Sequence, residues 1–257
     1  MSQDDVILEA RDLVKDFAGF QAVNHVSLKV RRGTIHALIG PNGAGKTTLF
    51  NLLTKFMPPT QGQILFKGSD ITKLAPADVA RRGLVRSFQI SAVFPHLSVL
   101  DNVRIALQRQ RGGSFDFWRS RSVLSIYHDR ARALLDEVGL TQYADEQAVS
   151  LAYGRKRALE LATTLALEPE LMLLDEPMAG MAHEDIERIQ ELIRKAAKNR
   201  TVLMVEHNLN VVASLSDTIT VLTRGQVLTE GDYKTVSNNL DVQQAYMGTG
   251  HEGVGHG

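Results

Sequence analysis

The chain has 257 residues, enough for one large domain or two modest ones with a substantial core. Lys and Arg total 29 and Asp and Glu total 29, so the formal net charge of +0 argues against binding nucleic acid through bulk positive charge. The absence of cysteine excludes disulfides, zinc–thiolate sites and thiol nucleophiles, and no apolar run approaches the ~18 residues that span a bilayer.

The first part of the chain predicts short strands separated by glycine turns. Segments 6–8, 26–30 and 64–66 are rich in apolar and β-branched residues, and turn signals stand at Gly33, Gly62 and Gly68. Segment 34–39 predicts a buried strand that ends at a glycine-rich turn. A helix is expected next, because apolar residues recur at helical spacing at Leu49, Leu52, Leu53 and Phe56, until Pro58 and Pro59 end it.

The middle of the chain predicts mostly helix, with helices over 97–110 and 125–138. Between Arg104 and Arg132, seven arginines accompany only two aspartates. This stretch is interpreted either as a solvated helical face or as a basic surface for lipid headgroups or a partner.

An alternation of strands and helices returns towards the end. Segments 171–174 and 202–205 predict buried strands, and the helix between them has one apolar face that consists of Ile186, Ile189, Ile193 and Ala196. Segment 219–228 predicts a closing hairpin around Gly225. The glycine-rich tail, 248–257, is expected to be mobile.

The glycine-rich turn carries a phosphate-binding pattern. Residues 40–47 read Gly-Pro-Asn-Gly-Ala-Gly-Lys-Thr, which is the spacing of a P-loop. In this pattern, backbone N–H groups converge on phosphate oxygens and the following helix presents its positive end. We expect Lys46 to reach the β- and γ-phosphates and the Thr47 hydroxyl to hold Mg²⁺.

Two acidic residues follow the apolar strand at 171–174. An Asp at such a strand end binds Mg²⁺ beside a P-loop, which is the role expected for Asp175. The adjacent Glu176 is placed to polarise an attacking water. Together with the P-loop, this element predicts binding of a nucleoside triphosphate, but it does not decide the class of protein.

Three further segments narrow that class. Phe88-Gln89 lies between the P-loop and segment 150–157, which reads Ser-Leu-Ala-Tyr-Gly-Arg-Lys-Arg, and His207 follows the next strand. With these motifs in this order, the chain resembles the ATP-binding subunits of ABC transporters from Phe17 to about Tyr246. Segments 16–23, 86–89, 93–95, 100–103 and 206–208 are similar to the branched-chain amino acid importer group, with urea and amide importers and the lipopolysaccharide export ATPase as similar neighbours.

The resemblance implies roles for individual residues. Phe17 matches the aromatic residue that stacks on adenine, Gln89 the glutamine that meets Mg²⁺ and water, and His207 the switch histidine that contacts the γ-phosphate. The implied catalytic set is Glu176, His207, Gln89 and Lys46. The implied Mg²⁺ ligands are Thr47, Gln89 and Asp175. The implied ATP site consists of Phe17, Val23, Asn42, Gly43, Ala44, Gly45, Lys46, Thr47 and Thr48.

The segments that such subunits donate to each other depart from the family pattern. In the family, the signature Leu-Ser-Gly-Gly-Gln of one subunit covers the nucleotide of the facing subunit; here that place is taken by Leu151, Ala152, Tyr153, Gly154 and Arg155. Tyr153 is usual for the subgroup, but Ala152 and Arg155 depart, and segment 179–182 lacks the family's Asp or Asn. Because the chain's own P-loop set is complete, we expect an unequal pair with a different ATPase subunit in preference to a homodimer.

Other P-loop classes carry motifs of their own. A GTPase would carry an Asn-Lys-x-Asp motif, and a DNA-repair ABC ATPase would carry a long coiled coil or zinc-binding cysteines; the sequence has neither. The alternatives are the ATPase of a lipopolysaccharide-type exporter and a small-molecule P-loop kinase, whose arginine lid the stretch Arg104–Arg132 could imitate. Glu176 and His207 argue against an inert nucleotide-binding module.

The sequence therefore predicts an α/β P-loop NTPase (RecA-like) core with an N-terminal antiparallel β subdomain and a helical insert subdomain. The expected divisions are a core of 1–88 and 159–247, a helical signature subdomain of 89–158 and a flexible tail of 248–257. The expected function is ATP hydrolysis, with Mg²⁺, that powers an importer for branched-chain amino acids or related amino acids and amides.

The expected partners are transmembrane permease subunits, a second ATPase subunit and, indirectly, a solute-binding protein, with no nucleic acid. The acidic opening Met1–Asp5 does not predict a signal peptide. The resemblance therefore implies a peripheral location at the cytoplasmic face of the inner (plasma) membrane.

Overall fold

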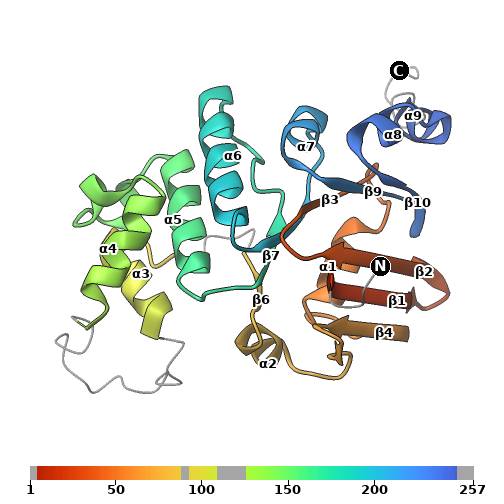
Figure 1. Cartoon of the computed structure of the whole chain (residues 1–257), viewed down its shortest axis with the longest axis horizontal. Coiled ribbons are helices and arrows are strands. Elements are labelled where there is room, and N and C mark those ends of the chain that lie inside the picture. Colours follow the sequence, from red (N-terminus) through yellow and green to blue (C-terminus); the bar gives the residue numbers. More distant parts are fainter. Residues whose placement is uncertain (1–4, 88–92, 109–125, 248–257) are drawn as a thin grey trace, which may run out of the picture.

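The computed structural model describes residues 5–87, 93–108 and 126–247, which form two β-sheets with helices packed around them (Figure 1). Phe88-Gln89, most of the arginine-rich stretch and the tail 248–257 lie outside the described residues. Within the described ranges, no helix has both the length and the apolar character needed to cross a membrane.

The first sheet is antiparallel, with strand order β2-β1-β4-β5. Its strands are β1 (Val6–Phe17), β2 (Phe20–Arg31), β4 (Gln61–Phe66) and β5 (Ser69–Asp70). β1 and β2 form a hairpin whose central residues, Ala18 and Gly19, have φ angles of 52° and 96°. Positive φ at both positions matches the twist of a tight hairpin, and the Asp16 carboxylate accepts from the Gly19 N–H at 2.8 Å. The turn therefore holds Phe17 and Phe20 opposite each other at its tip.

The second sheet has strand order β10-β9-β3-β8-β7-β6. Its strands are β3 (Ile35–Ile39), β6 (Leu84–Arg86), β7 (Leu171–Asp175), β8 (Thr201–Val205), β9 (Thr218–Thr223) and β10 (Gln226–Gly231). All neighbours are parallel except β9 and β10, which form the predicted closing hairpin. Because the carboxyl ends of parallel strands meet at one edge, the segments after β3, β7 and β8 lie together.

Helices cover both faces of this second sheet. α1 (Lys46–Leu53) lies between the two sheets, where Leu49 and Phe50 pack with Leu38 and Leu203. The opposite face is covered by α5 (Tyr153–Leu165), α6 (His183–Ala197) and α7 (Leu209–Leu215). The predicted apolar face of the segment 183–197 packs against the core, since Ile189, Ile193 and Ala196 are buried and Ile186 is partly buried against them.

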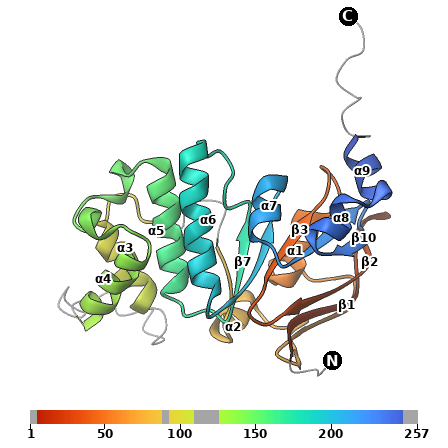
Figure 2. The same ribbon diagram turned by 45° about the horizontal axis from the view of Figure 1, so that its top comes forward.

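Four of the remaining helices, α3 (Val99–Gln108), α4 (His128–Glu137), α8 (Tyr233–Ser237) and α9 (Leu240–Met247), extend the molecule at its two ends, as Figure 2 shows. At one end, α3 and α4 pack against α5, with short 3-10 turns at Thr141–Tyr143 and Ala148–Ser150. α8 and α9 lie at the other end, and α2 (Pro76–Arg81) precedes β6. The predicted division at residue 158 falls inside α5, which continues across it, and the subdomain limits stay a prediction.

Some predicted boundaries were wrong. The helix expected to include Phe56 ends at Leu53, because Lys55 adopts φ 63° and donates its N–H to the Leu52 carbonyl at 3.1 Å. A left-handed residue after the last turn is a common way to end a helix. Strands β1 and β2 are longer than the predicted 6–8 and 26–30, since polar residues on the exposed face alternate with buried ones.

Candidate active site

The P-loop connects the end of β3 to the start of α1, and two of its glycines cannot be replaced. A Cβ at Gly40 would lie 2.2 Å from the Leu222 carbonyl oxygen, and one at Gly45 would lie 2.4 Å from that of Ala22. The φ angle of 96° at Gly45, the N-cap of α1, is also unfavourable for other residues. The loop therefore fits tightly against β2 and β9. The first turn of α1 contains no acidic residue, so no carboxylate there offsets the positive end of the helix.

The Lys46 ammonium group folds back over this loop. Its Nζ donates to the carbonyl oxygens of Gly40 at 2.6 Å and Pro41 at 3.0 Å. Burial lowers the pKa of Lys46, and the negative charge of Glu176 opposes that shift. Lys46 therefore lies between the phosphate-binding turn and the acidic end of β7.

The other predicted nucleotide contacts differ in exposure. Among them, Asn42, Gly43 and Thr47 are exposed, whereas Ala44 is buried. Phe17 is 44% exposed, and the Lys15 Nζ lies 5.2 Å from its ring centroid, so a ring face at the hairpin tip is available for stacking. The Val23 side chain is buried in the same core cluster as Ala44 of the P-loop, so it is not exposed to a nucleotide in this structure.

Asp175 ends β7 and forms an ion pair that was not predicted from the sequence. Its Oδ2 accepts from the Arg86 Nη2 at 2.5 Å, while the Arg86 Nη1 donates to the Asn51 side chain at 2.7 Å. The Arg86 guanidinium also lies over the rings of Phe50 and Phe56. Arg86 ends β6, the neighbour of β7, so the only sequence signal was a basic residue at a second strand end.

The oxygen donors at this edge are compatible with Mg²⁺. The bond to Arg86 uses Oδ2 of Asp175, and Thr47, the second residue of α1, offers a hydroxyl oxygen as a further donor. In the described part of the chain, no three His, Asp or Glu side chains converge to hold a metal by themselves. Proteins commonly bind Mg²⁺ through one or two carboxylates plus phosphate oxygens and water. The third predicted ligand, Gln89, lies outside the described residues.

Glu176 and His207 lie together on the segments that follow β7 and β8. The distance from Glu176 Oε1 to His207 Nδ1 is 4.0 Å. Glu176 has φ 45°, an unfavourable conformation for a residue with a side chain, and its N–H donates to the Val205 carbonyl at 2.9 Å. The hydrogen bond to β8 holds this strained turn, which places the carboxylate near both Lys46 and His207.

The predicted signature segment forms the start of α5. Ala152 is the N-cap, and no side chain caps the helix there. The Tyr153 hydroxyl donates to the Ala179 carbonyl at 2.9 Å and accepts from the Arg157 Nη2 at 2.9 Å. The guanidinium of Arg155 stacks on the Tyr143 ring at 4.3 Å. The signature segment is therefore bonded to the segment 179–182 within the same chain.

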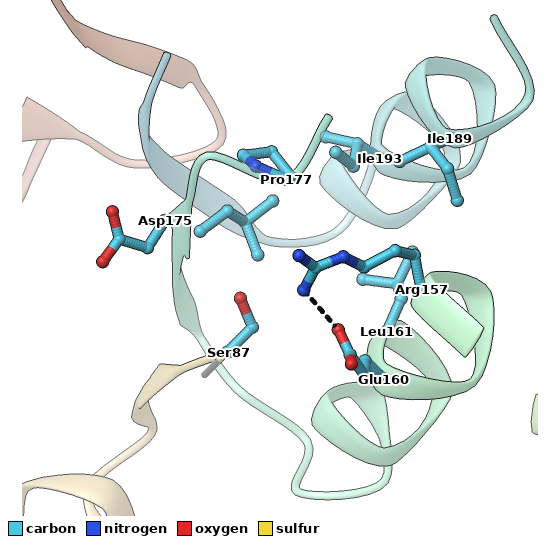
Figure 3. Close-up of a pocket in the computed structure, with 9 residues that line it drawn as sticks. Ser87, Arg157, Glu160, Leu161, Asp175, Pro177, Ile189 and Ile193 are labelled. Carbon is cyan, nitrogen blue, oxygen red and sulfur yellow. Dashed lines mark hydrogen bonds and ion pairs between the residues drawn. The ribbon is translucent and has the colours of Figure 1, made fainter. Parts of the chain in front are cut away.

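A small pocket of about 30 Å³ lies between α5, α6 and the end of β7 (Figure 3). Arg157 faces into it and donates to Glu160 at 2.7 Å, and Ser87 and Pro177 line its other side. The Asp175 side chain points away from Arg157. The two arginines, Arg86 and Arg157, thus serve different carboxylates on the two sides of β7.

Comparisons with known proteins agree with this geometry. The family model described as "ABC transporter" matches residues 23–179. The LivG protein of Salmonella typhimurium, a "High-affinity branched-chain amino acid transport ATP-binding protein", is 39% identical over 94% of this chain and 98% of its own length. The BraF protein of Pseudomonas aeruginosa, which has the same description, is also 39% identical with the same coverage.

A solved structure with a similar fold is the ADP conformation of an ATP-binding cassette of an ABC transporter. It is 29% identical, has a TM-score of 0.82 and matches 95% of this chain and 99% of its own. These findings confirm the predicted P-loop fold and the predicted family.

Proposed function

The chain belongs to the ABC transporter family as an ATP-binding subunit, and from this we propose that it hydrolyses ATP to power an importer of branched-chain amino acids. The observation that carries the substrate class is the end-to-end similarity to LivG and BraF, whose names state branched-chain amino acid transport. Related amino acids and amides belong to the same proposed cargo class.

The proposed reaction uses the side chains gathered at the edge of the parallel sheet. Lys46 exchanges the Gly40 and Pro41 carbonyls for phosphate oxygens, and Glu176 orients the attacking water and receives its proton. His207, 4.0 Å from Glu176, is placed to contact the γ-phosphate. Thr47, Asp175 and Gln89 would hold Mg²⁺, which would neutralise the charge that develops on the phosphates. Phe17 offers its exposed ring to the adenine base.

We further propose that the chain works in an unequal pair with a different ATPase subunit. The uncapped start of α5 at Ala152 supports this arrangement, because a serine at that position would offer both a helix cap and a hydroxyl for the facing γ-phosphate. Transmembrane permease subunits would hold this pair at the cytoplasmic face of the membrane, and a solute-binding protein would act through them.

The test is to co-purify the chain with its permease subunits and partner ATPase and to measure phosphate release. Leucine, isoleucine and valine, delivered by the solute-binding protein, are expected to stimulate hydrolysis, whereas lipopolysaccharide is not. Stimulation by lipopolysaccharide alone would favour the exporter, and transfer of phosphate to a solute would favour the kinase. Full activity of a complex that contains only this ATPase would contradict the unequal pair.

A further inference from the structure

A buried carboxylate lies directly beside the catalytic pair. Glu206 follows β8, precedes His207 and is 1% exposed. An isolated buried charge is costly, so such a group needs compensating hydrogen bonds. Burial raises the pKa of Glu206 above its ordinary value. Hydrogen bonds from three backbone N–H groups, together with the nearby His207, oppose that shift without cancelling it.

The partners of Glu206 come from two different loops. Its Oε1 accepts from the Met178 N–H at 3.1 Å, in the loop after β7. Its Oε2 accepts from the N–H groups of His207 at 3.2 Å and Asn208 at 3.4 Å, in the loop after β8. One carboxylate therefore joins the loop that begins with Glu176 to the loop that begins with His207.

This arrangement favours a carboxylate over other side chains of similar size. All three partners are donors, so both oxygens of Glu206 must accept. A glutamine would turn its NH₂ group towards at least one N–H, and two donors repel each other. An aspartate keeps the charge but is one methylene shorter, so it cannot reach both loops from the same backbone position.

We propose that Glu206 is a positioning residue for hydrolysis, which sets the separation of Glu176 and His207 by holding their two loops together. The backbone bond from the Glu176 N–H to the Val205 carbonyl joins the same strands but leaves Met178 and His207 unconnected. A shift of the His207 backbone therefore also shifts the loop after β7, which contains Met178 and continues into segment 179–182. The expected effect of Glu206 on kcat rests on the proposed ATP hydrolysis. The expectation that Glu206 holds the two loops together rests on the geometry alone.

The structural consequence is tested by amide hydrogen exchange on the full-length chain without nucleotide. Glu206→Gln is expected to speed exchange at Met178 and His207 at least tenfold. The control is Thr201→Val, at the other end of β8, which removes the acceptor for the Gly33 N–H. Thr201→Val is expected to lower overall stability without a selective effect at Met178 and His207. Unchanged exchange at these two amides in Glu206→Gln would overturn the proposal.

The kinetic consequence is tested in the assembled transporter. Glu206→Gln is expected to lower kcat at least tenfold while KM for MgATP stays within about twofold, and Thr201→Val is expected to leave both within about twofold. In a chain that already carries His207→Ala, Glu206→Gln should lower kcat by less than about a further twofold. The reason is that the effects of residues that act through one another are not additive.

The positioning role would be overturned if Glu206→Gln lowered kcat by the same factor with His207 and with His207→Ala. It would also be overturned if Thr201→Val caused the same loss of kcat as Glu206→Gln. If the unmodified complex fails to hydrolyse ATP in response to branched-chain amino acids, the proposed function fails. The hydrogen-exchange experiment still decides the inference in that case.

Discussion

Arg86 donates from Nη2 to the Asp175 Oδ2 at 2.5 Å, so the acid that ends β7 is paired with a base from the neighbouring strand. The two side chains are 12% and 4% exposed, which shields the pair from solvent. Removing one member of such a pair leaves the other charge buried without compensation. Arg86 therefore both holds the Asp175 carboxylate in place and compensates part of its negative charge.

Arg86→Met is expected to destabilise the chain by about 3–5 kcal/mol, because it leaves Asp175 as an unpaired buried charge. The measurement is the free energy of unfolding in urea. Asp175→Asn, introduced into the same chain, should restore part of this loss, so that the double variant is more stable than the sum of the single changes predicts. Strict additivity of the two changes would contradict the ion pair.

The stability of the chain should depend on pH through His36, which is buried on β3. Burial lowers the pKa of His36 to about 4. Its Nε2 lies 2.8 Å from the Thr220 hydroxyl, which donates to Glu230 at 2.6 Å. The unfolded chain binds a proton at His36 below about pH 6.5, whereas the folded chain does not until about pH 4. Stability is therefore lost as the pH falls through this window, by roughly 3 kcal/mol in total.

Urea unfolding of the unmodified chain and of His36→Phe, from pH 7 to pH 4, checks this dependence. The difference in unfolding free energy between the two chains should move in favour of His36→Phe by about 3 kcal/mol as the pH falls. Other titrating groups are common to both chains and largely cancel. A difference that is constant across the window would show that His36 does not contribute.

Those parts of the site that depend on local spacing can be predicted from the amino-acid sequence. The P-loop, the acid pair after β7 and the buried strands are each contained in one short segment. The Arg86–Asp175 pair joins residues 89 positions apart and depends on β6 lying beside β7, which no local pattern states. The bonds of Glu206 likewise depend on two loops meeting at one sheet edge.

The wrong helix end has a similar cause. Lys55 takes a left-handed conformation although it is not a glycine, so the usual signal for a helix end is absent. The core position of Val23 was also missed, because its burial depends on how α1 packs between the two sheets.

Ala152→Ser should increase hydrolysis at the partner's P-loop. The serine would cap α5, worth about 1 kcal/mol, and would donate to the facing γ-phosphate, which should speed that site roughly 10- to 100-fold. The measurement uses a complex with Glu176→Gln in this chain, so that only the partner's site turns over. The control is Ala77→Ser, at an exposed position in α2. No gain over the Glu176→Gln complex would contradict the arrangement.

Phe17→Ala should weaken the binding of ATP and GTP about equally, since stacking is worth ~1–3 kcal/mol and hardly depends on the base. A loss of roughly tenfold in affinity for both nucleotides is expected by calorimetry on the full-length chain. Phe20, which lies opposite Phe17 across the hairpin, provides the matched control. Weakening by Phe20→Ala with no change in Phe17→Ala would move the adenine platform to Phe20.

The central claim is that hydrolysis at Glu176 drives import of branched-chain amino acids. The most direct measurement is uptake of labelled leucine into vesicles that hold the complete transporter and its solute-binding protein. With the unmodified chain, we predict ATP-dependent accumulation of leucine. With Glu176→Gln, we predict MgATP affinity within about twofold of the unmodified chain but accumulation reduced by roughly two orders of magnitude, because the water is no longer activated. Accumulation that needs no ATP, or that persists in Glu176→Gln, would contradict the account.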